Sequence, residues 1–162
     1  MNDDSLARFE SIFRIDLDRS FDQVSDRVWE AITDSNQVSD WMKYPARIDA
    51  HLGGAVFVDF TPDEPLSGVV CKWEPGKAFA YTWGESIVEW RIAGDLAGSK
   101  LHFSHIGVRP KFLAGLAAGW HAFLDQLEGY LKGETRPDRF KELETKYKEA
   151  FDPALNATKD SA

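Results

Sequence analysis

The feature that most constrains this chain is one long amphipathic stretch near its C-terminal end, residues 110–132. Its large apolar residues recur at intervals of three or four, the period of one helix face; they are Leu113, Leu116, Trp120, Leu124, Leu127 and Leu131. Pro110 suits a first helical turn and Gly133 suits a C-terminal cap. At about 1.5 Å per residue, this helix would be roughly 30 Å long. It therefore needs a broad apolar partner surface, which we expect to be a sheet.

The residues before this helix predict short strands, because apolar and polar side chains alternate between turn signals about every 8–12 residues. The alternating apolar sets are Phe13/Ile15/Leu17, Ile48/Ala50/Leu52, Val56/Val58/Phe60, Val69/Cys71/Trp73, Phe79/Tyr81/Trp83, Val88/Trp90/Ile92 and Leu101/Phe103/His105. Gly53-Gly54 predicts a two-residue hairpin, since both positions tolerate positive φ. Residues 22–42 predict two short helices after the first strand. The first carries Val28, Trp29 and Ile32 and is capped by Asp22 or Ser25; the second carries Val38, Trp41 and Met42 and is capped by Asp34 or Ser35. The expected fold is α+β, an antiparallel sheet of about seven strands curved around the long helix.

The length and pattern of the sequence predict a single domain over residues 1–133, followed by an extension over residues 134–162. The extension carries a second amphipathic helix, whose stripe is Phe140, Leu143, Tyr147 and Phe151. Residues 154–162 predict a loose tail. Because the stripe is thin, it could dock on the domain or on another chain, which leaves a homodimer open.

Composition and net charge argue against several classes of binding partner. The formal net charge of −8 argues against nucleic acid and anionic membranes, which are bound through lysine and arginine. No stretch approaches the roughly 20 apolar residues of a membrane span, and the acidic N-terminus does not resemble a secretory signal, so we expect a cytoplasmic protein. Cys71 is the single cysteine, which excludes an intrachain disulfide and a thiolate metal cluster. Phosphate-loop, dinucleotide and CxxC motifs are absent, so no cofactor and no metal is expected.

Several stretches, taken in order, resemble motifs of a known superfamily. They are RSFDQVSDRVWEAITDSNQVSDWM at 19–42, HLGGAVFVDF at 51–60, GVVCKWEPGKAFAYTW at 68–83, SKLHFSHIGV at 99–108 and the Gly119-Trp120 pair. Through their order and spacing, about residues 13–132 resemble the SRPBCC or START-like helix-grip superfamily. Within it, the chain is most similar to the branch named after the activator of a heat-shock chaperone's ATPase.

This resemblance implies a helix-grip (Bet v-type) fold with a cavity between the sheet and the long helix. Relatives in the superfamily include lipid carriers, plant hormone and allergen-type binders, aromatase/cyclases and chaperone stimulators. The resemblance carries no catalytic motif to this chain, so no catalytic residue is assigned.

The histidines and paired charges each allow a functional and a structural interpretation. His105 shares a strand face with Phe103 and should point inward, either as a polar handle for a ligand or as a satisfied core histidine. His102 should face solvent, since odd offsets on a strand reverse the face. His121 and Asp125, four apart on the long helix, predict a surface pair. Glu89 and Arg91 likewise predict a surface pair, because burying both charges is costly.

A set of aromatic residues from separate segments could converge on the cavity, although aromatic stripes also form ordinary cores. The candidate ligand-binding residues are Trp41, Phe60, Trp73, Tyr81, Trp83, Trp90, His105, Leu116 and Trp120. Tyr81 and His105 would be the polar groups that orient the ligand. The mixture suits a planar or hydrophobic small molecule better than a sugar or a nucleotide.

Three functions remain open from the sequence. The first is non-enzymatic binding of a small hydrophobic or aromatic ligand. The second, implied by the resemblance, is a chaperone-linked interaction module that stimulates a heat-shock chaperone ATPase. The third is a cyclase or hydratase acting on an aromatic or polyketide-like substrate, with Tyr81 and His105 as acid and base. The first is the working prediction, because no inward-facing His–Asp dyad or carboxylate pair is visible.

Overall fold

The computed structural model describes residues 11–61 and 65–160, so residues 1–10, where the predicted domain begins, lie outside the described part. The elements are β1 (Phe13–Phe21), α2 (Ser25–Thr33), α3 (Ser35–Met42), β2 (Ala46–Ile48), β3 (Ala55–Val58), β4 (Leu66–Glu74), β5 (Ala78–Trp83), β6 (Ser86–Asp95), β7 (Gly98–Val108), α4 (Pro110–Lys132) and α5 (Phe140–Asp160). This order confirms the predicted α+β fold with two short helices after the first strand.

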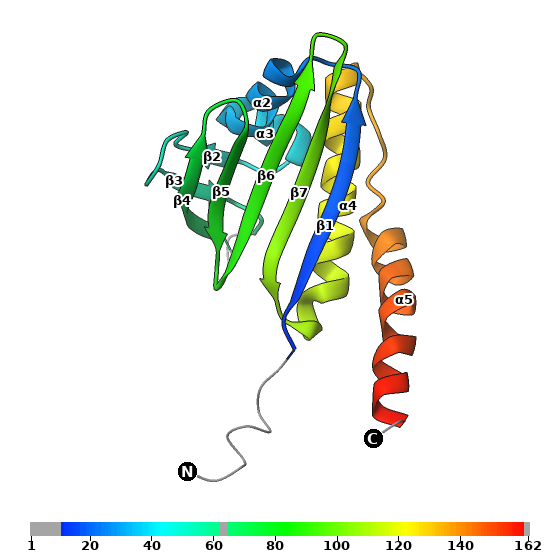
Figure 1. The fold of residues 1–162 in the computed structure, drawn as a ribbon. Coiled ribbons are helices and arrows are strands. Elements are labelled where there is room, and N and C mark those ends of the chain that lie inside the picture. Colours follow the sequence, from blue (N-terminus) through cyan, green and yellow to red (C-terminus); the bar gives the residue numbers. More distant parts are fainter. Residues whose placement is uncertain (1–10, 62–64, 161–162) are drawn as a thin grey trace.

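The seven strands form one antiparallel sheet in the order β1-β7-β6-β5-β4-β3-β2. Strands β2 to β7 pair with their neighbours in the sequence. β1 pairs with β7 and not with β2, because α2 and α3 separate β1 from β2 along the chain. The long helix α4 packs along one face of this sheet, and α2 and α3 cover one end of the same face (Figure 1). None of the helices within the described ranges is long and apolar enough to span a membrane.

The apolar face of β4 differs from the sequence prediction. Val70 is buried, whereas Val69 is half exposed and Cys71 is exposed, so the alternation assigned to Val69, Cys71 and Trp73 was wrong at its first two positions. The pairing of β4 with β5 shifts register between Val70 and Lys72. Such a bulge adds one residue and reverses the side-chain parity beyond it, which returns Trp73 to the inner face. The sequence carries no signal for the bulge.

The β2–β3 connection is longer than predicted. β2 ends at Ile48 and β3 begins at Ala55, so Leu52 lies in the connection with 64% of its surface exposed. Of these two glycines, only Gly53 has a positive φ, of 82°. This rules out the predicted two-residue turn, which needs a positive φ at both Gly53 and Gly54. Gly54 is needed for a different reason, because an added Cβ would lie 1.9 Å from the Asp49 carbonyl oxygen.

The long helix spans the predicted residues. Pro110 occupies its first turn, and Gly133 caps its C-terminus with a φ of 71°. One side of α4 packs on the sheet through Trp120, Leu124 and Leu127. Its opposite side carries small residues such as Ala118 and Ala122, against which α5 packs.

The helix α5 docks on the same chain. Leu143 is buried against α4, and Tyr147 and Phe151 pack on a second cluster that includes Ile15. Figure 1 shows α5 running alongside α4 and the β1 edge of the sheet. The sequence predicted a loose tail over residues 154–162, but the helix runs through residues 154–160, and residues 161–162 lie outside the described part.

Candidate functional site

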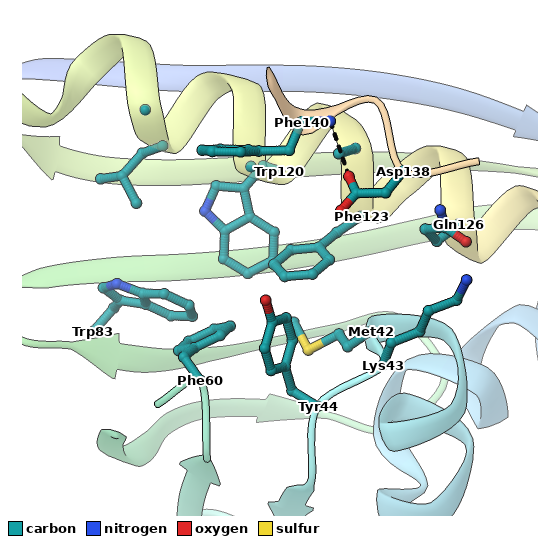
Figure 2. A pocket seen from close by; sticks show the side chains of 14 residues that line it. Met42, Lys43, Tyr44, Phe60, Trp83, Trp120, Phe123, Gln126, Asp138 and Phe140 are labelled. Carbon is teal, nitrogen blue, oxygen red and sulfur yellow. Dashed lines mark hydrogen bonds between the residues drawn. The ribbon is translucent and has the colours of Figure 1, made fainter. Parts of the chain in front are cut away.

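The candidate site is a mostly apolar cavity of about 420 Å³ beside α4. A larger hollow of about 960 Å³ elsewhere on the molecule is lined by charged side chains such as Arg19, Lys77 and Arg91. The lining of the candidate site comes from α4, from the connection after α3, from the ends of β3 and β5, and from the start of α5 (Figure 2). The residues are Met42, Lys43, Tyr44, Phe60, Trp83, Gly115, Leu116, Gly119, Trp120, Ala122, Phe123, Gln126, Asp138 and Phe140. Its volume falls within the range of small-molecule sites, roughly 300–1,000 Å³.

Two serines of α3 position the connection that carries Lys43 and Tyr44. Ser39 Oγ accepts a hydrogen bond from the Ala46 backbone N–H at 2.9 Å, and Ser35 Oγ accepts one from Ile48 at 2.9 Å. These bonds tie α3 to β2 on either side of the turn. Lys43 ends α3 in the left-handed region, at φ 63° and ψ 28°, the one non-glycine residue with positive φ within residues 11–61 and 65–160. The turn therefore holds both side chains at the cavity.

Five aromatic rings of the lining form a closed circuit, which we call the aromatic cluster: Tyr44, Phe60, Trp83, Trp120 and Phe123. The centroid distances around it are 5.2 Å for Tyr44–Phe60, 5.6 Å for Phe60–Trp83, 5.1 Å for Trp83–Trp120, 5.8 Å for Trp120–Phe123 and 6.3 Å for Phe123–Tyr44. Most pairs are tilted or edge-to-face, which is the favoured geometry for aromatic contacts. Four separate segments thus build one apolar wall.

The polar groups of the cavity come from three positions. Gln126 Nε2 donates to the carbonyl oxygens of Arg136 and Pro137, at 3.2 and 3.3 Å. Asp138 Oδ1 accepts the backbone N–H of Phe140 at 2.9 Å (Figure 2). The Lys43 ammonium forms no hydrogen bond or ion pair with any residue in the described part of the chain.

The structure divides the nine predicted ligand-binding residues. Phe60, Trp83, Leu116 and Trp120 line the cavity together. The other five do not line it and lie in or against the core; they are Trp41, Trp73, Tyr81, Trp90 and His105. Their role in binding stays a prediction, but any direct contact would require the core to open.

His105 is fully buried and both of its ring nitrogens are occupied. Trp120 Nε1 donates to His105 Nδ1 at 2.9 Å, and His105 Nε2 lies 2.7 Å from Ser86 Oγ. Because an indole N–H is only a donor, Nδ1 must be the acceptor and Nε2 carries the proton. Ser86 Oγ in turn donates to the Trp83 carbonyl oxygen at 2.6 Å. Burial lowers the pKa of His105 to about 4, so the ring is neutral near pH 7.

Tyr81 is also within the core. Its hydroxyl accepts a hydrogen bond from Trp90 Nε1 at 3.3 Å, and burial raises its pKa far above the ordinary value. Tyr81 and His105 have the geometry of satisfied core groups, the second of the two interpretations that the sequence left open for His105. Neither lines the cavity, so neither is placed to exchange a proton with a ligand there.

The remaining charged candidates lie at the surface, as the sequence predicted. The side chain of His102 is 41% exposed and bonds Asp18 and Asp16, which raise its pKa, Asp18 having the larger effect. Glu89 and Arg91 form an ion pair at 2.7 Å on the outer face of the sheet. Across residues 11–61 and 65–160, no cluster of three or more His, Cys, Asp or Glu could hold a metal.

His121 and Asp125 lie 3.9 Å apart, and both are partly exposed. Their surroundings include a partner that the sequence did not suggest, since Tyr147 of α5 places its hydroxyl 2.9 Å from His121 Nδ1. Burial beside α5 lowers the pKa of His121.

Sequence reasoning missed most of the polar lining and part of the aromatic cluster. Lys43 and Tyr44 follow a helix and precede Pro45, and nothing in their local sequence indicates a role. Phe123 lies in the long helix and Phe140 in the extension, and the sequence gives no indication that the two elements meet. A signal was available in α4, where Gly115 and Gly119 leave room for a second element; Gly119 lies next to the Phe140 ring.

Comparisons with known proteins agree with this architecture. CalU16 from Micromonospora echinospora superposes with a TM-score of 0.70 at 24% identity, over 85% of this chain and 84% of its own. DynU16, described as a protein in the dynemicin biosynthetic locus, gives a TM-score of 0.66 at 26% identity, over 77% of this chain and 50% of its own. The Aha1 dimer from Colwellia psychrerythraea gives 0.65 at 15% identity, over 73% and 95%.

A comparison with curated protein sequences found no match. The family described as Activator of Hsp90 ATPase homolog 1-like protein matches residues 23–132, more than half of the chain. The match covers both short helices, strands β2–β7 and all of α4, and it confirms the resemblance drawn from the sequence. The chain therefore belongs to the family of Activator of Hsp90 ATPase homolog 1-like proteins.

Proposed function

We propose that the chain binds a small hydrophobic or aromatic molecule in the cavity beside α4 and does not convert it chemically. The observation that carries this proposal is the aromatic cluster, which presents five rings to a space of about 420 Å³. Small-molecule sites are lined mainly by hydrophobic and aromatic side chains with a few polar groups, and this lining fits that description.

The hydrogen bonding of the tryptophans supports the same proposal. The indole N–H groups of Trp41, Trp90 and Trp120 donate to Ala31, Tyr81 and His105, respectively. The indole N–H groups of Trp29, Trp73 and Trp83 have no such acceptor among the described residues, and of these three only Trp83 lines the cavity. Buried or half-buried tryptophans usually find a partner for this group. A ligand or a water molecule in the cavity would supply one.

Two features support binding without reaction. Tyr81 and His105, the acid and base that a cyclase or hydratase would need, are bonded within the core and lie outside the cavity lining. The charged groups that do line it, Lys43 and Asp138, lie on separate elements and form no ion pair within 4.0 Å. General acid–base catalysis needs an acid or base positioned at the reacting group, and these two side chains form no such pair.

The proposal is tested by native mass spectrometry of the purified protein, followed by a tryptophan-fluorescence titration with hydrophobic small molecules. We expect a co-purified mass or a saturable quench with one site. Phe60→Ala should weaken the binding several-fold, because it removes one wall of the cavity. Phe57→Ala is the matched control, since Phe57 lies three residues earlier on the outer face and is 40% exposed. Equal loss of affinity in both variants would contradict a site in the cavity.

A second candidate is a chaperone-linked module, and the family description and the likeness to Aha1 favour it. Its test is the ATPase rate of a purified ninety-kilodalton heat-shock chaperone with and without this protein. Stimulation that persists in Phe60→Ala would favour the second candidate over the first. The cytoplasmic location and the homodimer stay predictions; the dimer is tested by sedimentation of the full chain.

A further inference from the structure

The polar lining of the cavity is uneven, and this bears on the class of ligand. Figure 2 shows Lys43, Gln126 and Asp138 on one side of the cavity, away from Trp83 and Phe60. A ligand that fills the cavity would therefore place one end on the aromatic cluster and the other among these polar groups. The charges at that polar end decide which ligands fit.

Lys43 and Asp138 are the two charged residues in the cavity lining, and they are not equivalent. Asp138 Oδ1 accepts the backbone N–H of Phe140, the first residue of α5, and the carboxylate lies at the positive end of that helix. Both effects stabilise its negative charge. Asp138 is therefore largely satisfied without a ligand.

Lys43 is exposed to solvent and has no comparable compensation from the protein. Its ammonium makes no hydrogen bond or ion pair with the described residues. Its backbone caps α3 in the left-handed region, with the N–H bonded to the Ser39 carbonyl at 3.0 Å. This cap fixes where the chain leaves α3 and so holds the lysine at the rim of the cavity, in a chain whose net charge is −8.

Tyr44 adds a hydrogen-bond donor to the cavity and no second charge. Its hydroxyl has no partner among residues 11–61 and 65–160, and Figure 2 shows it pointing toward Phe123, away from the Lys43 ammonium. Gln126 already uses its amide N–H groups on the backbone carbonyls of Arg136 and Pro137. Lys43 is therefore the charged group at the polar end that is left to pair with a ligand.

We propose that the ligand is a planar aromatic molecule with one anionic substituent, whose ring packs on the aromatic cluster and whose anionic group pairs with Lys43. The proposal rests on the proposed function, because it assumes that this cavity holds a ligand. A carboxylate or sulfonate on a fused-ring aromatic has the required shape and charge. The cavity volume of about 420 Å³ accommodates two or three fused or linked rings.

The test uses two probes that differ by one sulfonate, N-phenyl-1-naphthylamine and 1-anilinonaphthalene-8-sulfonate, both of which become fluorescent when bound. We expect Lys43→Met to lower the affinity for the sulfonate probe by about two- to fivefold at low salt, the range for an exposed ion pair. The same variant should leave the affinity for the neutral probe unchanged. Lys43→Arg should retain the affinity for the sulfonate probe, since it keeps the charge.

Lys148→Met is the matched control, because it makes the same change in net charge on an exposed lysine of α5 that lines none of the cavities formed by the described residues. If Lys148→Met and Lys43→Met lower the sulfonate affinity equally, the inference is wrong, because the affinity then depends only on the net charge of the protein. If the neutral probe binds and Lys43→Met affects neither probe, the inference is wrong but the proposed function stands. If neither probe binds to the wild-type protein, both fail.

Discussion

The space between α4 and the sheet is filled in one region and open in another, although tryptophans line both. In the filled region, Trp41, Trp90 and Phe103 are at most 2% exposed, and Trp90 packs edge-to-face on Phe103 at 4.8 Å. In the open region, Phe60 and Trp83 are only partly buried and border the cavity. Trp120 belongs to both. Tryptophan side chains are therefore packed in the core in the filled region and line a cavity in the open region.

The difference lies in how each region is covered. The filled region is closed by α2 and α3, which insert Val28, Ile32 and Trp41 against the sheet. The open region is covered by the 43–45 turn and by the start of α5, which meet the cavity with Lys43, Asp138 and Phe140. Short connections cannot supply a continuous apolar face, so the space there stays accessible.

The difference between the two regions is tested most strongly by replacing one tryptophan in each. Trp90→Ala should destabilise the fold by about 3–5 kcal/mol, because it leaves a cavity in close-packed core. Trp83→Ala should cost less than half as much, because the ring already borders open space. Urea denaturation followed by circular dichroism measures both. Equal losses would mean that the two regions are packed alike.

The pH dependence of stability tests the filled region through His105. Its pKa is about 4 in the fold and about 6.5 in the unfolded chain. Between these values the unfolded state binds more protons, so stability falls as the pH falls from about 6.5 toward 4. The loss from this group is up to about 3 kcal/mol, since one pKa unit corresponds to about 1.4 kcal/mol.

His105→Gln removes this titration and should flatten the stability profile between pH 6.5 and 4.5, measured by urea denaturation at each pH. His102→Gln is the control with the opposite sign. Hydrogen bonds to Asp18 and Asp16 raise the pKa of His102 in the fold, so its contribution is present below pH 6.5 and lost as the pH rises through the raised value. A profile that keeps its slope in His105→Gln would contradict the neutral buried ring.

The smallest expected effect comes from the strained turn of the open region. Lys43→Gly should stabilise the fold by up to about 1 kcal/mol, because glycine adopts positive φ without a Cβ penalty. The same variant should lose affinity for the sulfonate probe, as Lys43→Met does. Thermal unfolding of Lys43→Gly, Lys43→Met and wild type checks the first effect. A variant that is less stable than wild type would show that Lys43 is held there for structural reasons.

Much of the fold could be predicted from periodicity. The helix over residues 110–132 and the alternating strands each have one apolar face, and few arrangements bury the apolar faces of both. The site followed only in part. Alternation correctly turned Phe60, Tyr81, Trp83 and His105 inward, but it gives no information on depth along the sheet, which separates Trp83 in the wall from His105 in the core. The β4 bulge and the docking of α5 depend on tertiary contacts, so neither could be read from local patterns.

The central claim is that the open region, and not the filled one, holds a ligand, and the six tryptophans report on this directly. Each indole N–H gives its own signal in a ¹H–¹⁵N correlation spectrum, which can be followed during a titration with N-phenyl-1-naphthylamine. The account predicts that the signals of Trp83 and Trp120 move, while those of Trp41 and Trp90 stay in place. Shifts confined to Trp29 and Trp73, or no shift at saturating probe, would contradict it.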